Sequence, residues 1–422
     1  MNTKDLYQIY LQCAGLNTDT RTIQEGQLFV ALKGENFDGN SFALQALEAG
    51  AAYAVVNDTV EADDERLIKV PDTLAALQQL AAFHRQQFDI PVIGLTGTNG
   101  KTTTKELIRA VLSAGYSVTA TQGNLNNDIG VPLSVLKINA DTQIAIIEMG
   151  ASHPEDLKPL LAVARPTHGL ITNVGKAHLL GFGSFEGVKH AKGLLYDYLK
   201  ENGGVAFANA DDAVLQEMLW DREMSRIPYG MDGVELLPAS AENPFLRLRF
   251  PDGYELKTSL VGAYNAYNVL AALKIGWFFN VPLAAARAAV EAYVPSNNRS
   301  QLQKTARNTV IVDAYNANPS SMAVALDNLA LQTGRKVALL GDMRELGADS
   351  AAEHARIVAR LNGQEAFLVG EEFTKAAAGT AFPCFATSDD LAAYLQEHPL
   401  EGCTVLVKGS RGTRMEKVIP SL

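Results

Sequence analysis

The chain has 422 residues and a formal net charge of −11 at pH 7, with 36 Lys and Arg against 47 Asp and Glu. At about 100–200 residues per domain, this length predicts roughly three domains, each large enough to bury its own core. The acidic balance argues against a nucleic-acid scaffold, which usually has a basic face. No run approaches the ~20 apolar residues of a membrane-spanning helix, and the N-terminal segment lacks a signal-peptide core.

The three cysteines, Cys13, Cys384 and Cys403, are widely spaced. They predict neither a disulfide framework nor a paired-cysteine metal site. This usage is typical of a reducing compartment, so we expect a cytoplasmic location.

Short strands and helices alternate from residue 1 to about residue 84. Residues 28–32 (LFVAL) and 51–56 (AAYAVV) predict buried strands. Residues 41–50 have helical spacing and end on a glycine, a typical helix stop.

From about residue 89, buried-strand runs alternate with helical segments, which predicts a parallel, doubly wound sheet. These runs are residues 91–96, 144–149, 169–174 and 204–209. The alternating stretch 246–262 predicts a small antiparallel insertion, and residues 264–280 predict a closing helix.

A third region begins near Pro295 and contains further buried-strand runs separated by helices, at residues 309–315, 336–342, 366–370 and 404–409. The predicted fold is therefore α/β in three domains: a small α/β domain (1–86), a central doubly wound parallel sheet (87–295) and a Rossmann-like C-terminal domain (296–422).

The segment GLTGTNGKTTTKEL (94–107) runs from a strand through a glycine-rich turn into a helix. Such a turn presents backbone N–H groups to an anion. Lys101 is expected to reach the terminal phosphates, and the Thr102 hydroxyl is expected to join a Mg²⁺ shell. The usual phosphate-loop pattern has glycine where this chain has Leu95, so the loop is a variant; the alternative is a chance glycine-rich turn.

The sequence GTNGKTT (97–103) resembles the loop of the Mur ligases and the related folylpolyglutamate synthetases. The rest of the chain, from about Asp19 to the C-terminus, closely resembles the Mur ligases that add D-alanyl-D-alanine. The motifs that carry this resemblance are GNLNNDIGVPLSVL (123–136), EMGASHPEDL (148–157), TNVGKAHLLGFGSFEGVKHAKG (172–193), GAYNAYNVLAAL (262–273), NNRSQ (297–301), DAYNANPSSM (313–322), LGDMRELG (340–347) and VKGSRGTRMEKV (407–418).

The resemblance implies an ATP-dependent, ADP-forming ligase of peptidoglycan precursor synthesis. Its three domains are expected to hold, in chain order, the UDP end of UDP-N-acetylmuramoyl-tripeptide, ATP, and the incoming D-Ala-D-Ala. The tripeptide carboxylate attacks the γ-phosphate of ATP, and the amine of D-Ala-D-Ala then attacks the acyl phosphate. Cations are needed to offset the repulsion between the two anions.

The resemblance also implies two Mg²⁺ sites, with Thr102, Glu148, His178 and Lys192 as the metal-binding set. Glu148 ends a predicted strand, at the sheet edge where ligands of α/β proteins bind; the alternatives are a solvated loop carboxylate or a helix cap. His178 corresponds to the family's second metal site, although a lone histidine is more often structural. Lys192 is the position that the family carbamylates, and its alternative is a surface lysine.

The remaining nucleotide contacts come from resemblance as well. Asn268 corresponds to an adenine-side asparagine, and Arg299 and Asp313 to residues that the third domain brings to ATP. Asp313 and Asn316 have helix capping as their structural alternative. The loop residues expected at the nucleotide are Gly97, Thr98, Asn99, Gly100, Lys101, Thr102 and Thr103, and the expected catalytic set is Lys101, Lys192, His178, Arg299 and Asp313.

Substrate contacts are expected from three loops. Thr20 and Arg21 are candidates for the UDP end. Amides in the turn after residues 117–122 are candidates for the muramoyl or peptide part, with turn formation as the alternative; they are Asn124, Asn126 and Asn127. For D-Ala-D-Ala, Asp342 is expected to accept the ammonium group, and the terminal carboxylate is assigned to Lys408, Ser410 and Arg411.

Three alternatives remain: a Mur ligase that adds the third residue, a folylpolyglutamate synthetase-like ligase, and a non-catalytic nucleotide-binding module. The chain lacks the DNPR-like motif of the first, and its loop differs from the GKGS of the second. We expect a monomer with no nucleic-acid partner, and the third residue of the tripeptide stays open between meso-diaminopimelate and lysine.

Overall fold

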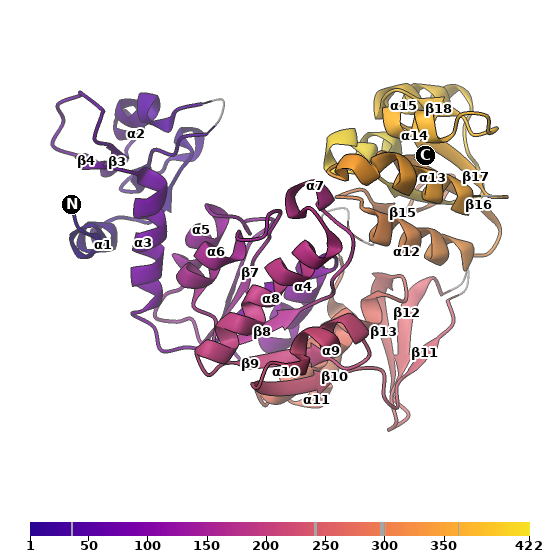
Figure 1. Cartoon of the computed structure of the whole chain (residues 1–422), viewed down its shortest axis with the longest axis horizontal. Coiled ribbons are helices and arrows are strands. Elements are labelled where there is room, and N and C mark those ends of the chain that lie inside the picture. Colours follow the sequence, from indigo (N-terminus) through magenta and orange to yellow (C-terminus); the bar gives the residue numbers. More distant parts are fainter. Residues whose placement is uncertain (35–36, 240–242, 296–298, 300, 362) are drawn as a thin grey trace. The chain divides into compact units, whose positions relative to one another are not determined.

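The fold is described from a computed structural model of the chain, which covers residues 1–34, 37–239, 243–295, 299, 301–361 and 363–422. The chain forms two compact units. The first comprises Met1–Gly94, Ser117–Gly150 and Asp156–His168; the second comprises Leu95–Tyr116, Ala151–Glu155 and Gly169–Leu422. Figure 1 labels the elements along the sequence.

The N-terminal region forms a parallel sheet with the strand order β1-β2-β3-β4. Its elements are α1 (Thr3–Gln12), β1 (Leu16–Asn17), η1 (Thr20–Thr22), β2 (Leu28–Val30), η2 (Gly39–Phe42), α2 (Ala43–Glu48), β3 (Tyr53–Asn57), β4 (Leu67–Val70) and α3 (Thr73–Arg85). Phe29 and Val56 pack with Leu47 of α2 in one buried cluster. The two strands and the helix predicted here are therefore confirmed. The helix α2 ends just before Gly50, whose φ of 106° suits the turn that follows.

The central region builds a sheet with the strand order β10-β9-β8-β5-β7-β6. Its elements are β5 (Val92–Thr96), α4 (Lys101–Leu112), β6 (Val118–Ala120), α5 (Gly130–Val135), β7 (Ile144–Glu148), α6 (Leu157–Ala164), β8 (His168–Ile171), α7 (Leu179–Phe182), α8 (Phe185–Glu201), β9 (Val205–Asn209), α9 (Ala213–Trp220) and β10 (Ser225–Tyr229). Helices connect strands that are not sequential neighbours, which confirms the doubly wound prediction.

An antiparallel sheet with the order β11-β12-β13 follows, as predicted from alternation. It consists of β11 (Glu235–Leu237), β12 (Phe245–Arg249) and β13 (Glu255–Val261), and α10 (Asn265–Phe278) and α11 (Leu283–Ala292) come next. α10 packs against α4, the helix that starts at the glycine-rich turn.

The C-terminal sheet has the order β14-β15-β19-β16-β17-β18, and β14 alone pairs antiparallel among its described strands. Its elements are β14 (Gln301–Lys304), β15 (Thr309–Asp313), α12 (Pro319–Ala330), β16 (Arg335–Gly341), η3 (Gly347–Asp349), α13 (Ser350–Arg360), β17 (Glu365–Val369), α14 (Glu371–Ala376), β18 (Cys384–Phe385), α15 (Ser388–Glu397), β19 (Cys403–Lys408), η4 (Arg411–Thr413) and η5 (Met415–Ser421).

Residues of this last sheet alternate between two buried clusters. Ile311 and Leu340 belong to one cluster, whereas Val312 and Leu339 belong to the other. A sheet buried on both faces gives the continuous apolar runs from which its inner strands were predicted. The edge strands β14 and β18 were not predicted, because they are short and only partly buried.

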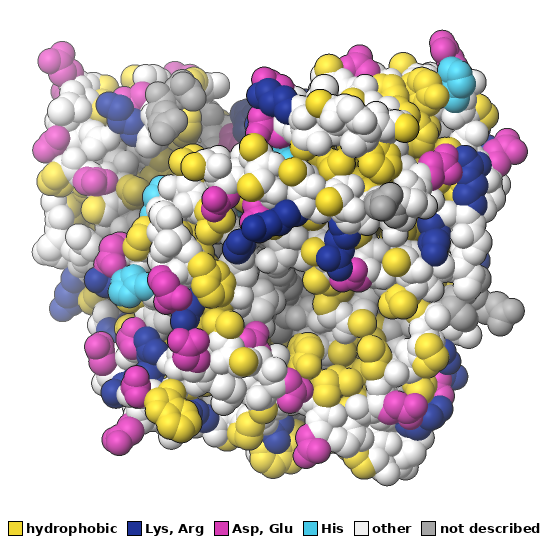
Figure 2. Space-filling view, turned by 45° about the vertical axis from the view of Figure 1, so that its right-hand side comes forward, with side chains coloured by type: hydrophobic (Ala, Val, Ile, Leu, Met, Phe, Trp, Pro, Cys, Tyr) yellow, Lys and Arg dark blue, Asp and Glu magenta, His cyan; other side chains and the backbone are white. Residues whose placement is uncertain are grey.

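The described residues contain no helix that is long and apolar enough to cross a membrane. Figure 2 shows acidic and basic side chains interspersed over the displayed face, without a large field of one sign.

Candidate functional site

The glycine-rich turn between β5 and α4 has the backbone geometry of an anion-binding loop. Gly97 has φ of 142° and Gly100 has φ of 80°, a region that side chains disfavour. A Cβ atom at Gly97 would lie 2.0 Å from the Thr172 hydroxyl oxygen, and one at Gly100 would lie 3.0 Å from Asn268 Oδ1. Gly97 therefore needs glycine for conformation and for space, whereas Gly100 needs it chiefly for its left-handed conformation.

Residues that follow β8 hold this loop in place. The Thr98 amide donates to the Asn173 carbonyl at 2.9 Å, and the Asn99 amide donates to Asn173 Oδ1 at 3.0 Å. The Thr172 hydroxyl donates to the Asn99 carbonyl at 2.7 Å. Sequence reasoning assigned no role to Thr172 or Asn173, although both belong to the quoted TNVGKAH motif.

Lys101 begins α4 and folds back over the loop. Its Nζ donates to the carbonyls of Gly97 and Thr98 at 2.8 and 3.2 Å. Thr102, in the first turn, is buried with 4% of its surface exposed. The Lys101 ammonium group and the N-terminus of α4, next to a glycine-rich turn, are suited to binding the phosphates of a nucleotide.

Asn268 lies in α10 and its amide is used inside the protein. The Thr104 hydroxyl donates to Asn268 Oδ1 at 3.0 Å, and Asn268 Nδ2 donates to Asn265 Oδ1 at 2.8 Å. These bonds place Asn268 against Gly100, so in this structure it supports the start of α4.

Glu148, in the first unit, ends β7 and is almost fully buried. Asn126 Nδ2 donates to its Oε1 at 2.8 Å, and its own amide donates to the Thr121 hydroxyl at 3.0 Å. A buried carboxylate held by an amide fits a hard-cation ligand.

His178 and Lys192 lie in the second unit. His178 precedes α7 in a left-handed backbone conformation, and its Nδ1 contacts the Glu345 carboxylate. Burial lowers the pKa of His178, the Glu345 charge opposes that change, and the charges of Lys101 and Lys192 lower the pKa further. Lys192, in α8, is 2% exposed; its Nζ donates to the Ala151 carbonyl at 3.3 Å.

Two C-terminal candidates are bound to each other. Lys408 Nζ donates to Asp313 Oδ2 at 2.5 Å and to the Asn316 carbonyl at 3.2 Å. The Lys408 side chain is 2% exposed. Ser410 is also buried, and its Oγ accepts the Arg344 amide at 2.8 Å. The structure therefore uses these groups within the protein.

Arg299 and Arg411 face the same aromatic ring. Their guanidinium carbons lie 3.6 and 5.3 Å from the centre of the Tyr315 ring. Cations over the face of a tyrosine ring are attracted by its quadrupole. The other residues of the predicted NNRS segment, Asn297, Asn298 and Ser300, lie outside the described residues.

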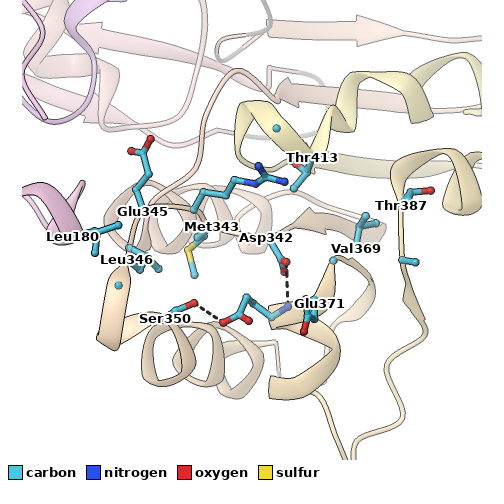
Figure 3. Close-up of a pocket in the computed structure, with 16 residues that line it drawn as sticks. Leu180, Asp342, Met343, Glu345, Leu346, Ser350, Val369, Glu371, Thr387 and Thr413 are labelled. Atoms are coloured by element: carbon cyan, nitrogen blue, oxygen red, sulfur yellow. Dashed lines mark hydrogen bonds between the residues drawn. The ribbon is translucent and has the colours of Figure 1, made fainter. Parts of the chain in front are cut away.

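Asp342 lines a cavity of about 750 Å³ in the second unit. Its carboxylate accepts the amides of Glu372 and Phe373 at 3.1 and 2.8 Å, so it caps α14. Figure 3 shows Leu180, Glu345 and Leu346 together at one side of this cavity, with Thr387 at the opposite side.

The remaining candidates belong to the first unit. Arg21 is exposed and pairs with Asp19, whose pKa this hydrogen bond lowers to about 2. Thr20 lies beside it in η1. Asn127 Oδ1 accepts the Gly130 amide at 2.8 Å at the start of α5, whereas Asn124 is exposed.

Among the described residues, no three His, Cys, Asp or Glu side chains gather in a metal-binding group. Mg²⁺ usually binds one or two carboxylates together with phosphate oxygens and waters. The buried Thr102 hydroxyl beside the phosphate loop is consistent with that mode.

Known proteins match this chain along nearly its full length. Family models match residues 12–85 (Mur ligase family, catalytic domain), 95–276 (Mur ligase middle domain) and 298–411 (Mur ligase, glutamate ligase domain). The UDP-N-acetylmuramoyl-tripeptide–D-alanyl-D-alanine ligases of Bacillus subtilis and Escherichia coli are 34% and 36% identical. The matches span 97% and 96% of this chain and 93% of each relative.

Solved structures of such ligases are also similar to this chain along nearly its full length. MurF from Acinetobacter baumannii is 31% identical with a TM-score of 0.88, covering 100% of this chain and 98% of that one. MurF from Thermotoga maritima, solved with ADP, is 27% identical with a TM-score of 0.85. The match covers 98% of this chain and 97% of that one.

Two solved structures represent the alternative ligases considered above, and they resemble this chain in fold alone. A UDP-N-acetylmuramoyl-L-alanyl-D-glutamate–2,6-diaminopimelate ligase is 19% identical with a TM-score of 0.53, covering 94% of this chain and 89% of that one. The Mycobacterium tuberculosis folylpolyglutamate synthase is 17% identical with a TM-score of 0.63, covering 82% and 94%. The full-length similarity thus favours neither alternative, and the chain belongs to the Mur ligase family.

Proposed function

We infer that this chain is an ATP-dependent ligase that adds D-Ala-D-Ala to UDP-N-acetylmuramoyl-tripeptide and forms ADP. The observation that carries this inference is the match to such ligases along nearly the entire chain, including a glycine-shaped phosphate loop. The tripeptide carboxylate takes the γ-phosphoryl group of ATP to become an acyl phosphate. The dipeptide amine then forms the amide and releases phosphate.

Within this reaction, Lys101 and the loop amides hold the phosphates and offset the charge that spreads over the transferring group. Asn268 orients the adenine side, and Arg299, Asp313 and Asn316 act at the nucleotide from the third domain. The support is the fit of the loop to an anion and, for Arg299, the stacking of its guanidinium over the Tyr315 ring.

Two Mg²⁺ sites use Thr102, Glu148, His178 and a carbamylated Lys192. Bound Mg²⁺ neutralises phosphate charge. Burial of the Lys192 amine supports the modification, because desolvation favours the neutral amine that reacts with CO2, and a carbamate supplies oxygen ligands. In the modification, the neutral amine attacks CO2 and loses a proton.

The substrate roles follow the three predicted domains, 1–86, 87–295 and 296–422. Thr20 and Arg21 bind the UDP end, and the amides Asn124, Asn126 and Asn127 bind the muramoyl-peptide part. D-Ala-D-Ala enters the cavity beside Asp342, which accepts its ammonium group, and its carboxylate is held by Lys408, Ser410 and Arg411. The requirement for ATP supports a cytoplasmic location; a monomeric state stays a prediction.

The test is phosphate release from ATP with each substrate omitted in turn. Release is expected only when both UDP-N-acetylmuramoyl-tripeptide and D-Ala-D-Ala are present. Equal release without D-Ala-D-Ala, or none with both substrates, would contradict the proposal. Running the assay with meso-diaminopimelate and lysine tripeptides in parallel identifies the third residue.

A further inference from the structure

Two residues with left-handed backbones meet in the second unit. His178 has φ of 50° and Glu345 has φ of 64°, and neither is glycine. The Glu345 carboxylate contacts His178 Nδ1, and the Glu345 carbonyl accepts the Leu180 amide at 3.2 Å. Left-handed conformations of such residues persist only where the surroundings enforce them, and they are enriched at ligand sites. The pair is thus held by both its backbones and its side chains.

The contact favours one tautomer of the imidazole. A carboxylate can only accept a hydrogen bond, so a hydrogen bond along this contact requires the proton to be on Nδ1. A neutral imidazole carries one ring proton, which leaves the lone pair on Nε2. Histidines that bind metals commonly donate their other N–H to a carboxylate, which sets the ring orientation and the basicity of the ligating nitrogen.

We propose that Glu345 is a positioning residue that holds His178 with Nε2 ready to bind the second metal ion. The proposal rests on the metal-binding role given to His178 in the proposed function. Glu345 lies in the LGDMRELG motif, after β16, and the sequence reasoning gave it no role.

Glu345 also borders the cavity that contains Asp342. Leu180, which packs near Gly347, lines the same cavity (Figure 3). The same carboxylate therefore touches the histidine and borders the cavity assigned to the dipeptide. Filling that cavity is expected to alter the hold on His178, and so to couple dipeptide binding to metal binding.

The first measurement needs no metal and no turnover. In ligand-free protein carrying ¹⁵N-labelled histidine, two-bond ¹H–¹⁵N spectra report the ring tautomer, and His178→Asn identifies the signal among the seven histidines. We expect the Nδ1–H form in the wild type and the commoner Nε2–H form in Glu345→Ala. An Nε2–H wild type, or an unchanged tautomer in Glu345→Ala, would overturn the proposal.

The second measurement is Mn²⁺ affinity by electron paramagnetic resonance, with a non-hydrolysable ATP analogue at saturation. Glu345→Ala is expected to weaken one protein-dependent Mn²⁺ site about 10- to 100-fold, and Glu345→Gln, whose carbonyl accepts the same N–H, to retain most affinity. Glu371→Ala is the matched control, because Glu371 lines the same cavity but pairs with Lys375.

His178→Asn separates the two possible failures. Wild-type Mn²⁺ affinity in His178→Asn would contradict the metal role in the proposed function. A loss in His178→Asn without a loss in Glu345→Ala would leave that role intact and overturn the positioning role alone.

Discussion

Gly97→Ala tests whether the phosphate loop is shaped by the steric limit at one residue. The new methyl group would meet the Thr172 hydroxyl at 2.0 Å, and the backbone would keep φ of 142°. The unfavourable backbone costs about 1–3 kcal/mol. Displacing Thr172 breaks its 2.7 Å bond to the Asn99 carbonyl, which adds about 1 kcal/mol.

The expected loss is therefore about 2–4 kcal/mol in unfolding free energy, with a rise in the KM for ATP because the loop amides move. Urea unfolding and ATP-dependent phosphate release measure the two effects. Gly203→Ala is the control, since Gly203 has φ of 66° but nothing within 4 Å of the added methyl group; it should lose only about 1–2 kcal/mol and keep the KM.

Thr172→Ala in the Gly97→Ala background removes the hydroxyl that causes the clash. The double variant should then be less destabilised than the sum of the single variants, which is the signature of direct contact. Additive losses, or a Gly97→Ala protein that matches Gly203→Ala in stability and retains the wild-type KM for ATP, would refute the steric reasoning.

Other predictions concern buried charge, protonation and capping. Lys408→Met leaves the Asp313 carboxylate without its 2.5 Å partner and should cost about 3 kcal/mol in urea unfolding; an unchanged midpoint would contradict a stabilising pair. Burial lowers the pKa of His168 from 6.5 to about 4, so the unfolded chain binds the proton more tightly and stability falls as the pH drops from about 6.5 to 4. His168→Asn should remove up to about 3 kcal/mol of that pH-dependent loss, and parallel wild-type and variant curves would contradict the assignment. Asn318→Ala removes the α12 capping box and the 2.8 Å bond to Asn99 Oδ1; a loss of about 1 kcal/mol should appear as a lower Tm, and an unchanged Tm would contradict the capping role.

Much of the fold was predictable because its inner strands are buried on both faces. The runs that include Ile144–Glu148 and Thr309–Asp313 are apolar without alternation, which marks them regardless of distant contacts. The two-residue strands β1 and β18 carry too little pattern to be recognised. Their pairing depends on neighbours that only the folded chain supplies.

The phosphate loop could be predicted because its residues are local in sequence. Gly97, Gly100 and Lys101 share one short turn between a strand and a helix, so the sequence alone predicts an anion-binding loop. The supports of that turn come from residues more than 70 positions away, such as Asn173. The contact between His178 and Glu345 spans a still longer stretch of sequence. No local pattern encodes such pairs, although both members lie within motifs that the resemblance had singled out.

The pairing of Lys408 with Asp313 changes how their proposed roles must be tested. Asp313 was assigned to the nucleotide and Lys408 to the dipeptide carboxylate, yet the two side chains form one ion pair, in which Lys408 is buried and Asp313 is 19% exposed. A single substitution at either position removes this ion pair and so perturbs the other residue as well. Loss of activity in one variant therefore cannot assign a ligand. The informative comparison is Asp313→Asn with Lys408→Met as single and double variants, because removing both charges restores neutrality while still removing each contact to a ligand. A selective rise in the KM for ATP or for D-Ala-D-Ala in the stable double variant identifies which ligand the pair serves.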